Sequence, residues 1–118
     1  MRESLAPRER IRKKKDFLII YKKGKRYRNK YFNLIYLSNT LTFSRVGVVA
    51  SSKVGNAVIR SKVKRWMREL FRRNKNLLEF SLDLLIVATP EMGQATWTEL
   101  EAHYLSAARK VFAKKREQ

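Results

Sequence analysis

Residues 53–75 read KVGNAVIRSKVKRWMRELFRRNK, and this stretch decides the fold because it predicts one long amphipathic helix from about Ala57 to Lys75. Its apolar side chains recur at spacings of three and four residues, which brings them onto one face of a helix. That face comprises Ile59, Val63, Trp66, Met67, Leu70 and Phe71. Asn56 is a suitable N-cap, and Asn74 to Asn76 favour an end there. The rest of the chain must therefore provide a surface that covers this apolar face.

Three segments around this helix have the composition of β-strands. Tyr31 to Leu37 and Arg45 to Ser51 are rich in aromatic and β-branched residues, and Asn39 to Thr42 between them predicts a hairpin turn. Leu82 to Thr89 is an almost unbroken apolar run that ends before Pro90. Such a run is typical of a strand that is buried on both faces. We therefore expect one sheet.

Two further helices complete the pattern. Asp16 is suited to cap a short, mostly apolar helix that Gly24 would end as its C′ residue. Thr96, with Glu99 three residues later, forms a capping-box pattern at the start of a C-terminal helix. The element order is α-β-β-α-β-α. The predicted fold class is α/β, in the form of a single-domain α+β sandwich with one sheet.

The charge of the chain narrows the classes of function. Its 118 residues contain 28 Lys and Arg against 10 Asp and Glu, a formal net charge of +18, while 44% of the residues are hydrophobic. That apolar fraction is enough for a core and excludes a disordered basic tail. Self-repulsion at this charge destabilises a compact state, so we expect a partner of opposite charge: nucleic acid, an anionic membrane surface or an acidic protein. No apolar run approaches the ~20 residues of a membrane span.

The chain has few residue combinations that suit catalysis. His103 is its only histidine, it has no cysteine, and no glycine-rich phosphate loop occurs. Its carboxylates, such as Asp16 and Asp83, are scattered along the chain. A nuclease that activates water with metal ions needs clustered carboxylates. We therefore predict no catalytic residue and no metal site in this chain, and a partner should carry any chemistry in which it takes part.

A row of cations runs along the predicted central helix. Its members are Arg60, Lys64, Arg68 and Arg72, beside Ser61 and Arg65. With a rise of ~1.5 Å per residue the row is ~18 Å long, which matches several successive phosphates. Arginine binds phosphate through paired hydrogen bonds, so the row predicts a nucleic-acid contact. The alternative is a solvated helix face, but such faces usually mix charges, and Glu69 is the one acid between Ala57 and Lys75.

A second candidate surface is aromatic. Phe17 and Tyr21 lie one turn apart on the first helix, and Ile35 or Tyr36 of the first strand could lie beside them. Single-stranded RNA is held by basic grooves whose aromatic side chains stack on bases. Packing in the core is the alternative for this pair. The N-terminal region adds candidate RNA contacts, with a solvated tail as the alternative: Arg10, Arg12, Lys13 and Lys14.

Residues 53–69, KVGNAVIRSKVKRWMRE, resemble the signature of the protein subunit of bacterial ribonuclease P, which runs KxGNAVxRNxxKRxxRE. The chain departs from this pattern at Ser61, where the family usually has asparagine. A hydroxyl does not offer the paired donor and acceptor of an amide. Residues 16–24 (DFLIIYKKG) resemble the family's first helix, and residues 45–49 and 83–87 fit its strands.

The resemblance implies a fold, and the charge density of residues 1–15 together with Pro7 indicates a division of the chain. The fold is ribosomal protein S5 domain 2-like, with a left-handed βαβ crossover through the central helix, although ~98% of such connections are right-handed. We place a basic, flexible N-terminal arm at residues 1–15 and a single RNA-binding domain at residues 16–118.

The resemblance also implies the partners. A large catalytic RNA, with Mg²⁺ bound mainly by that RNA, would remove the 5′ leader of precursor tRNA as an endoribonuclease that leaves 5′-phosphomonoesters. The resemblance places Arg60, Lys64, Arg65 and Arg68 against RNA. The full predicted RNA-binding set adds Lys53, Ser61 and Arg72. The resemblance places Phe17 and Tyr21 in the leader-binding cleft, and we add Ile35 and Tyr36 to the predicted cleft as the strand residues beside them. We expect a cytoplasmic location in a bacterium, no contact with a membrane and no need for a protein partner.

Two other classes of protein are compatible with a basic surface of this kind. One is a structural ribosomal-type RNA-binding protein that has no processing role. The other is a peripheral protein on anionic membranes. The signature helix favours the ribonuclease P subunit. The membrane class is disfavoured because Trp66 falls on the apolar stripe and leaves no exposed Trp- and Leu-rich face beside the cations.

Overall fold

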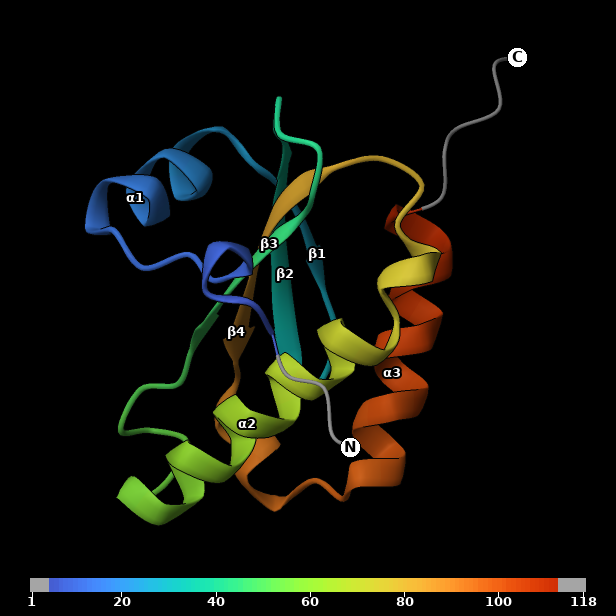
Figure 1. Cartoon of the computed structure of the whole chain (residues 1–118). Helices are drawn as coiled ribbons and strands as arrows, with labels where there is room; N and C mark the ends of the chain where they lie inside the picture. Colours follow the sequence, from blue (N-terminus) through green and yellow to red (C-terminus); the bar gives the residue numbers. More distant parts are fainter. Residues whose placement is uncertain (1–4, 113–118) are drawn as a thin grey trace.

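A four-stranded sheet organises the computed structural model, which describes residues 5–112 (Figure 1). The helices and strands follow the chain as α1 (Lys14–Lys23), β1 (Lys25–Arg28), β2 (Phe32–Ser38), β3 (Arg45–Val49), α2 (Ala57–Arg73), β4 (Leu82–Ala88) and α3 (Trp97–Val111). Short 3-10 turns span Pro7–Glu9, Lys75–Leu77 and Pro90–Gln94. The order in the sheet is β1-β2-β4-β3, with β3 and β4 parallel and the other pairs antiparallel. The predicted α-β-β-α-β-α order is confirmed, with β1 as an addition.

The predicted hairpin between the second and third strands is wrong. β2 and β3 both pair with β4 and are separated by it. Leu82 to Ile86 are buried, and the inner position pairs both backbone edges of this apolar strand while helices cover both of its faces. The segment from Asn39 to Ser44 therefore crosses the beginning of β4, where the Leu82 N–H donates to the Ser44 hydroxyl at 3.0 Å.

The main core lies between one face of the sheet and helices α2 and α3. Helix α2 contributes Val63, Met67, Leu70 and Phe71 to this core, which confirms the predicted apolar face. The strands contribute alternate residues to the same core, among them Phe32, Leu34, Val46, Leu84 and Ile86. The parallel pair β3 and β4, joined through α2, confirms that a crossover connects them. Its left-handedness stays a prediction.

The opposite face of the sheet is covered by α1 alone among the described helices. Ile20 of α1 packs there with Ile35, Leu85 and Ile11, and Phe17 and Tyr21 lie at the margin of this small cluster. Figure 1 shows α1 at the upper left, apart from α2 and α3. The part of this face beyond α1 is open, and that opening positions the candidate site.

The helix ends agree with the predicted caps except at α1. Asn56 accepts a hydrogen bond from the Ile59 N–H at 3.0 Å, and the Thr96–Glu99 capping box is present. At α1 the N-cap is Lys13, and Asp16 lies inside the first turn. Gly24 does end α1, but at φ −75° rather than in the left-handed conformation expected of a C′ residue. Glycine is required there by space, since a Cβ would lie 2.7 Å from the Ile20 carbonyl oxygen.

Part of the segment predicted as a flexible arm at residues 1–15 contacts the folded domain. Leu5 and Ile11 are buried, one in each core cluster, and the Arg10 backbone forms a parallel bridge with Val46 of β3. Lys14 and Lys15 belong to α1. The apolar side chains at 5 and 11 dock the segment onto the sheet, which outweighs the repulsion among its cations. Residues 1–4 lie outside the described part.

Candidate nucleic-acid interface

The cation row of α2 lies at the edge of the solvent-facing surface of the helix. Burial of Val63, Met67, Leu70 and Phe71 sets the rotation of α2 about its axis. As a consequence Arg60, Lys64 and Arg68 are half-buried, while Ser61 and Arg65 are exposed. Lys53 is also exposed, in the loop that precedes the Asn56 cap. The predicted row is therefore accessible along most of the helix.

Arg72, the last member of the row, is held by an acid. The Glu69 carboxylate accepts hydrogen bonds from Arg72 Nε at 3.0 Å and Nη2 at 2.6 Å, and from Arg73 Nε at 2.6 Å. These hydrogen bonds, those of Arg72 first, lower the pKa of Glu69 to about 2. The carboxylate is thus charged at neutral pH and offsets part of the charge at this end of α2.

Three arginines from two distant parts of the chain line one hollow. A cavity of about 350 Å³ is bounded by Arg10 and Arg12 of the N-terminal segment, Arg68 of α2, Phe17 of α1 and the β3 backbone around Gly47. Burial, followed by the charges of Arg10 and Arg12, lowers the pKa of Arg68. Among the described residues, no carboxylate lines the cavity. An arrangement of three guanidinium groups of this kind is suited to bind a phosphate.

Two of the predicted cations carry a buried atom that also lacks a partner. The Nε atoms of Arg10 and Arg60 are buried, and neither has a hydrogen-bond acceptor among residues 5–112. A buried guanidinium donor is costly to leave unpaired. Both side chains therefore keep an unsatisfied donor within the described residues. Lys13 and Lys14, the other two arm residues, are exposed at the start of α1 and do not line the cavity.

The aromatic pair lies on the sheet-facing side of α1 and is only partly buried. Phe17 packs on Gly47, where an added Cβ would lie 2.9 Å from its ring carbons. The Arg26 guanidinium lies 5.7 Å from the centre of the Tyr21 ring and donates a hydrogen bond to the Tyr21 carbonyl at 2.6 Å. Ile35 lies beneath this pair but is 2% exposed, so it forms a floor. The same two rings thus pack against the sheet and keep part of their surface accessible.

Tyr36 does not belong to this site. Successive side chains of a strand point to opposite faces, so only one of Ile35 and Tyr36 can face α1. Tyr36 lies on the other face, where its ring meets Phe112 edge-on at 6.3 Å, and burial raises its pKa. Its inclusion in the predicted cleft is a correction that follows from the strand geometry.

Two cations of β1 join the site although the sequence pattern did not single them out. Arg26 and Arg28 are opposite Ile35 and Asn33 in the register, so they share the face that α1 leaves open. The signal was the alternation in Lys25-Arg26-Tyr27-Arg28, which places two arginines on one face of a strand. It was missed because a strand with three cations in four residues lacks the usual apolar composition.

An ion-pair network fixes α1 over the sheet. Arg45 of β3 donates to both carboxylate oxygens of Asp83, at 2.9 and 2.6 Å, and lies 3.6 Å from the carboxylate of Asp16 in α1. The Asn39 amide also donates to Asp83, at 2.8 Å. The hydrogen bonds with Asp83 raise the pKa of Arg45. Asp83, the acid in the apolar strand, therefore has a structural partner.

Other features of the described residues bear on the class of function. Within residues 5–112 no three His, Asp, Glu or Cys side chains come together as a metal site. The His103 ring contacts Tyr31 edge-on at 4.9 Å. None of the described helices is both long and apolar enough to cross a membrane.

Comparison with known proteins finds one family whose members resemble this chain over most of its length. The family model described as Ribonuclease P matches residues 5–112. The ribonuclease P protein component of Thermotoga maritima is 42% identical over 94 residues, which cover 80% of each chain. That of Alkaliphilus metalliredigens is 36% identical over 102 residues, or 86% of this chain and 92% of the relative.

The solved structures agree. The 2.0 Å structure of the Staphylococcus aureus RNase P protein has a TM-score of 0.79 and 35% identity, and the match covers 88% of this chain and 97% of that one. A structure of the RNase P protein from Thermotoga maritima has a TM-score of 0.76 and 32% identity, over 93% of this chain and 98% of that one.

Proposed function

This chain belongs to the ribonuclease P protein family and has the role of that enzyme's protein component in tRNA processing, and from this premise we propose that it binds two RNAs through adjoining surfaces. The cations of α2 and of the N-terminal segment bind the catalytic RNA of the enzyme. The open sheet face beside Phe17 and Tyr21 binds the 5′ leader of precursor tRNA.

One observation carries this proposal above the others. The cavity of Arg10, Arg12 and Arg68 is also lined by Phe17, so the basic surface and the aromatic surface are continuous. Phosphates bind cations, while unstacked bases pack on aromatic rings. A single-stranded leader presents both groups in alternation and matches such a surface. A duplex would satisfy only the cations, because its bases are stacked inside.

The proposal divides the surface among named residues. Arg60, Lys64, Arg65 and Arg68 contact phosphates of the catalytic RNA, with Lys53 at one end of α2 and Arg72 at the other. Ser61 lies exposed among these cations and contributes a single hydroxyl where the family has an amide. Phe17 and Tyr21 stack on leader bases over the floor formed by Ile35. Arg26 and Arg28 bind the leader backbone on the same face of the sheet.

The chemistry is assigned to the RNA. The described residues do not fit a protein-held magnesium site, because their carboxylates are not grouped in threes. In the proposal Mg²⁺ is bound mainly by the catalytic RNA, whose phosphates are oxygen ligands of the kind this ion prefers. The chain contributes binding and electrostatic neutralisation. This takes place in the bacterial cytoplasm, where precursor tRNA is made, and needs no additional protein.

Reconstitution tests the proposal. The full chain is combined with the catalytic RNA of the same bacterium, and site-specific cleavage of a precursor tRNA is followed as magnesium is lowered. We expect cleavage to 5′-phosphomonoester products to persist at magnesium concentrations at which the RNA alone is inactive, and the chain alone to be inactive. Site-specific cleavage by the RNA-free chain, or no effect of the chain on the RNA, would contradict it. The ribosomal-type alternative predicts no effect and is disfavoured by the family match.

A further inference from the structure

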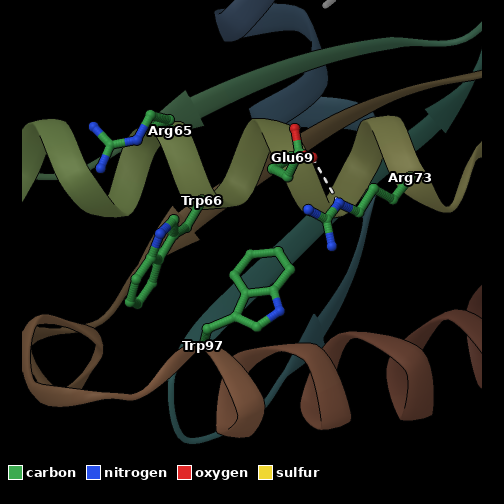
Figure 2. A pocket seen from close by; sticks show the side chains of 5 residues that line it. All are labelled: Arg65, Trp66, Glu69, Arg73 and Trp97. Atoms are coloured by element: carbon green, nitrogen blue, oxygen red, sulfur yellow. Dashed lines mark hydrogen bonds and ion pairs between the residues drawn. The ribbon is translucent and has the colours of Figure 1, made fainter. Parts of the chain in front are cut away.

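Both tryptophans of the chain line a pocket on the other flank of α2. This cavity of about 290 Å³ is bounded by Arg65, Trp66, Glu69 and Arg73 of α2 and by Trp97, the first residue of α3 (Figure 2). The two indole rings meet edge to face, with centres 5.8 Å apart and planes at 74°. The pocket shares no residue with the cavity of Arg10, Arg12 and Arg68. It also contains none of the residues assigned above to the leader, which are Phe17, Tyr21, Ile35, Arg26 and Arg28, so it is separate from that surface.

Cations surround the two rings. The Arg73 guanidinium lies 5.2 Å from the centre of the Trp97 ring, and the Lys62 ammonium lies 4.9 Å from that of Trp66. Arg65 adds a third positive charge at the rim and is exposed. Glu69 contributes the one carboxylate among the described lining residues and is already bound by Arg72 and Arg73, as Figure 2 shows for Arg73. The pocket thus combines aromatic surface with an excess of positive charge.

We propose that this pocket binds one unpaired nucleotide of the catalytic RNA, with the base against the indoles and the phosphate on Arg65 and Arg73. The inference rests on the proposed function, which places the same RNA along the cations of α2. An α-helix turns ~100° per residue, which places Arg68, Arg65 and Arg73 at successive angles around the axis of α2. Arg68 is nearest the cavity that it shares with Arg10 and Arg12, and Arg73 is nearest α3. An RNA backbone that contacts the first two reaches the third, and with it the tryptophans.

The chemistry of the pocket favours a nucleotide over other occupants. Ligand pockets usually measure about 300–1,000 Å³, so this cavity has room for one small planar group with its attachments. Indole is the aromatic ring that associates best with cations and offers the largest stacking surface. Glu69 can only accept hydrogen bonds when ionised, so it disfavours a phosphate at its own position and is suited to an amino group on a base edge. The charged rim excludes a purely apolar guest.

Intrinsic fluorescence provides a direct test, because every tryptophan of the chain lies in this pocket. The unaltered protein is titrated with adenosine 5′-monophosphate, and in parallel with ribose 5-phosphate, which has the sugar and phosphate but no base. The readout is the tryptophan emission lifetime, which light absorption by the nucleotide does not change. We expect a saturable shortening with the nucleotide and none with the sugar phosphate. Equal responses, or no response to either, would overturn the proposal.

Substitution then tests whether the occupant belongs to the RNA partner. Trp97→Leu keeps an apolar, though smaller, side chain and removes the stacking surface, and it should weaken binding of the catalytic RNA about 5-fold to 150-fold. Trp97→Phe should recover most of the affinity. Tyr27→Leu is the matched control, since Tyr27 pairs with Lys110 at 5.9 Å but does not line this pocket. Unchanged affinity in a folded Trp97→Leu protein overturns the proposal while leaving the proposed function intact. Failure of the unaltered chain to bind the catalytic RNA would contradict both the pocket proposal and the proposed function.

Discussion

At the scale of single residues, the proposed leader site depends on which face of the sheet a side chain occupies. Tyr21 lies on the face that α1 leaves partly open, with a guanidinium beside its ring. Tyr36, in β2, lies on the covered face against Phe112. The two tyrosines therefore form a natural pair for separating binding from folding.

Tyr21→Ala should weaken binding of precursor tRNA to the reconstituted enzyme about 5-fold to 150-fold, because the loss of one stacked base costs ~1–3 kcal/mol. Binding of mature tRNA, which has no leader, should change little. Tyr36→Ala should instead lower the melting temperature and affect both ligands alike, since it removes a packed ring. Affinities for the two tRNAs, measured with thermal unfolding of each variant, check this. Equal losses of affinity for both tRNAs in Tyr21→Ala, with a lower melting temperature, would show that Tyr21 is a core residue that does not contact the leader.

Glu69 gives the chain an acid-sensitive contribution to stability. Its pKa is lowered from 4.5 to about 2 in the folded state. A carboxylate of this kind stabilises the fold fully above pH 4.5, and the contribution is lost as the pH falls toward 2. Glu69→Gln should cost about 0.5–1 kcal/mol at pH 7, because the pair lies near the surface, and the cost should vanish by about pH 2. Denaturant unfolding at several pH values measures it.

The control for this variant is Glu91→Gln, which removes an exposed carboxylate in the turn Pro90–Gln94 and changes the net charge equally. Its effect on stability should be small at every pH. If Glu69→Gln and Glu91→Gln behave alike, the ion pairs of Glu69 with Arg72 and Arg73 contribute nothing specific.

At the scale of elements, the core surface of α2 is separate from the surface proposed to face RNA. Four of its apolar residues are buried, and none of the row residues Arg60, Lys64 and Arg68 belongs to that set. The helix can therefore lose charge on one side without losing its packing on the other. This separation makes the salt dependence of binding a direct measure of the row.

Replacing Arg60, Lys64 and Arg68 together with alanine should flatten the salt dependence of binding to the catalytic RNA. The slope of log K against log salt should fall by about two units or more, at ~0.7–0.9 per lost phosphate contact. The fold should persist, as checked by circular dichroism and thermal unfolding. The control is Lys110→Ala on α3, which removes an exposed cation far along the chain from the row. An unchanged slope in the triple variant would mean that these three cations face solvent and do not contact the RNA.

At the scale of the whole molecule, the net charge of +18 opposes folding. Most of the charge is exposed, but Arg10, Arg12 and Arg68 are brought together around a cavity that no carboxylate of residues 5–112 lines. Ligands that bind only the folded state stabilise it by mass action. A small divalent anion should therefore stabilise this protein beyond the general effect of salt.

Sulfate at about ten times its dissociation constant should add about 1.4 kcal/mol to the free energy of unfolding, or roughly 4–8 °C in melting temperature, relative to chloride at equal ionic strength. Arg68→Gln removes one of the three guanidinium groups and should reduce this difference. General effects of sulfate on hydration would act equally on both proteins. An identical sulfate effect in Arg68→Gln would mean that the cavity does not bind the anion.

The sequence by itself determined α1, α2, α3, the strands β2, β3 and β4 and the cation row of α2, because those depend on local periodicity and composition. The apolar stripe of α2, its Asn56 cap and the Thr96–Glu99 capping box are all signals between neighbours in the chain. The cation row followed from the same periodicity. Each of these is settled within a few residues.

Only the tertiary structure decided which distant segments meet. The insertion of β4 between β2 and β3 depends on burial of both its faces, which no turn signal between residues 39 and 42 records. The same pairing sets which residues of β1 and β2 face α1, and so placed Arg26 in the site and Tyr36 outside it. The cavity that joins Arg10, Arg12 and Arg68 arises because Leu5 and Ile11 dock the N-terminal segment beside β3. The physical reason is that burial of apolar surface is not directional, so its partners are selected by the packing of the whole domain.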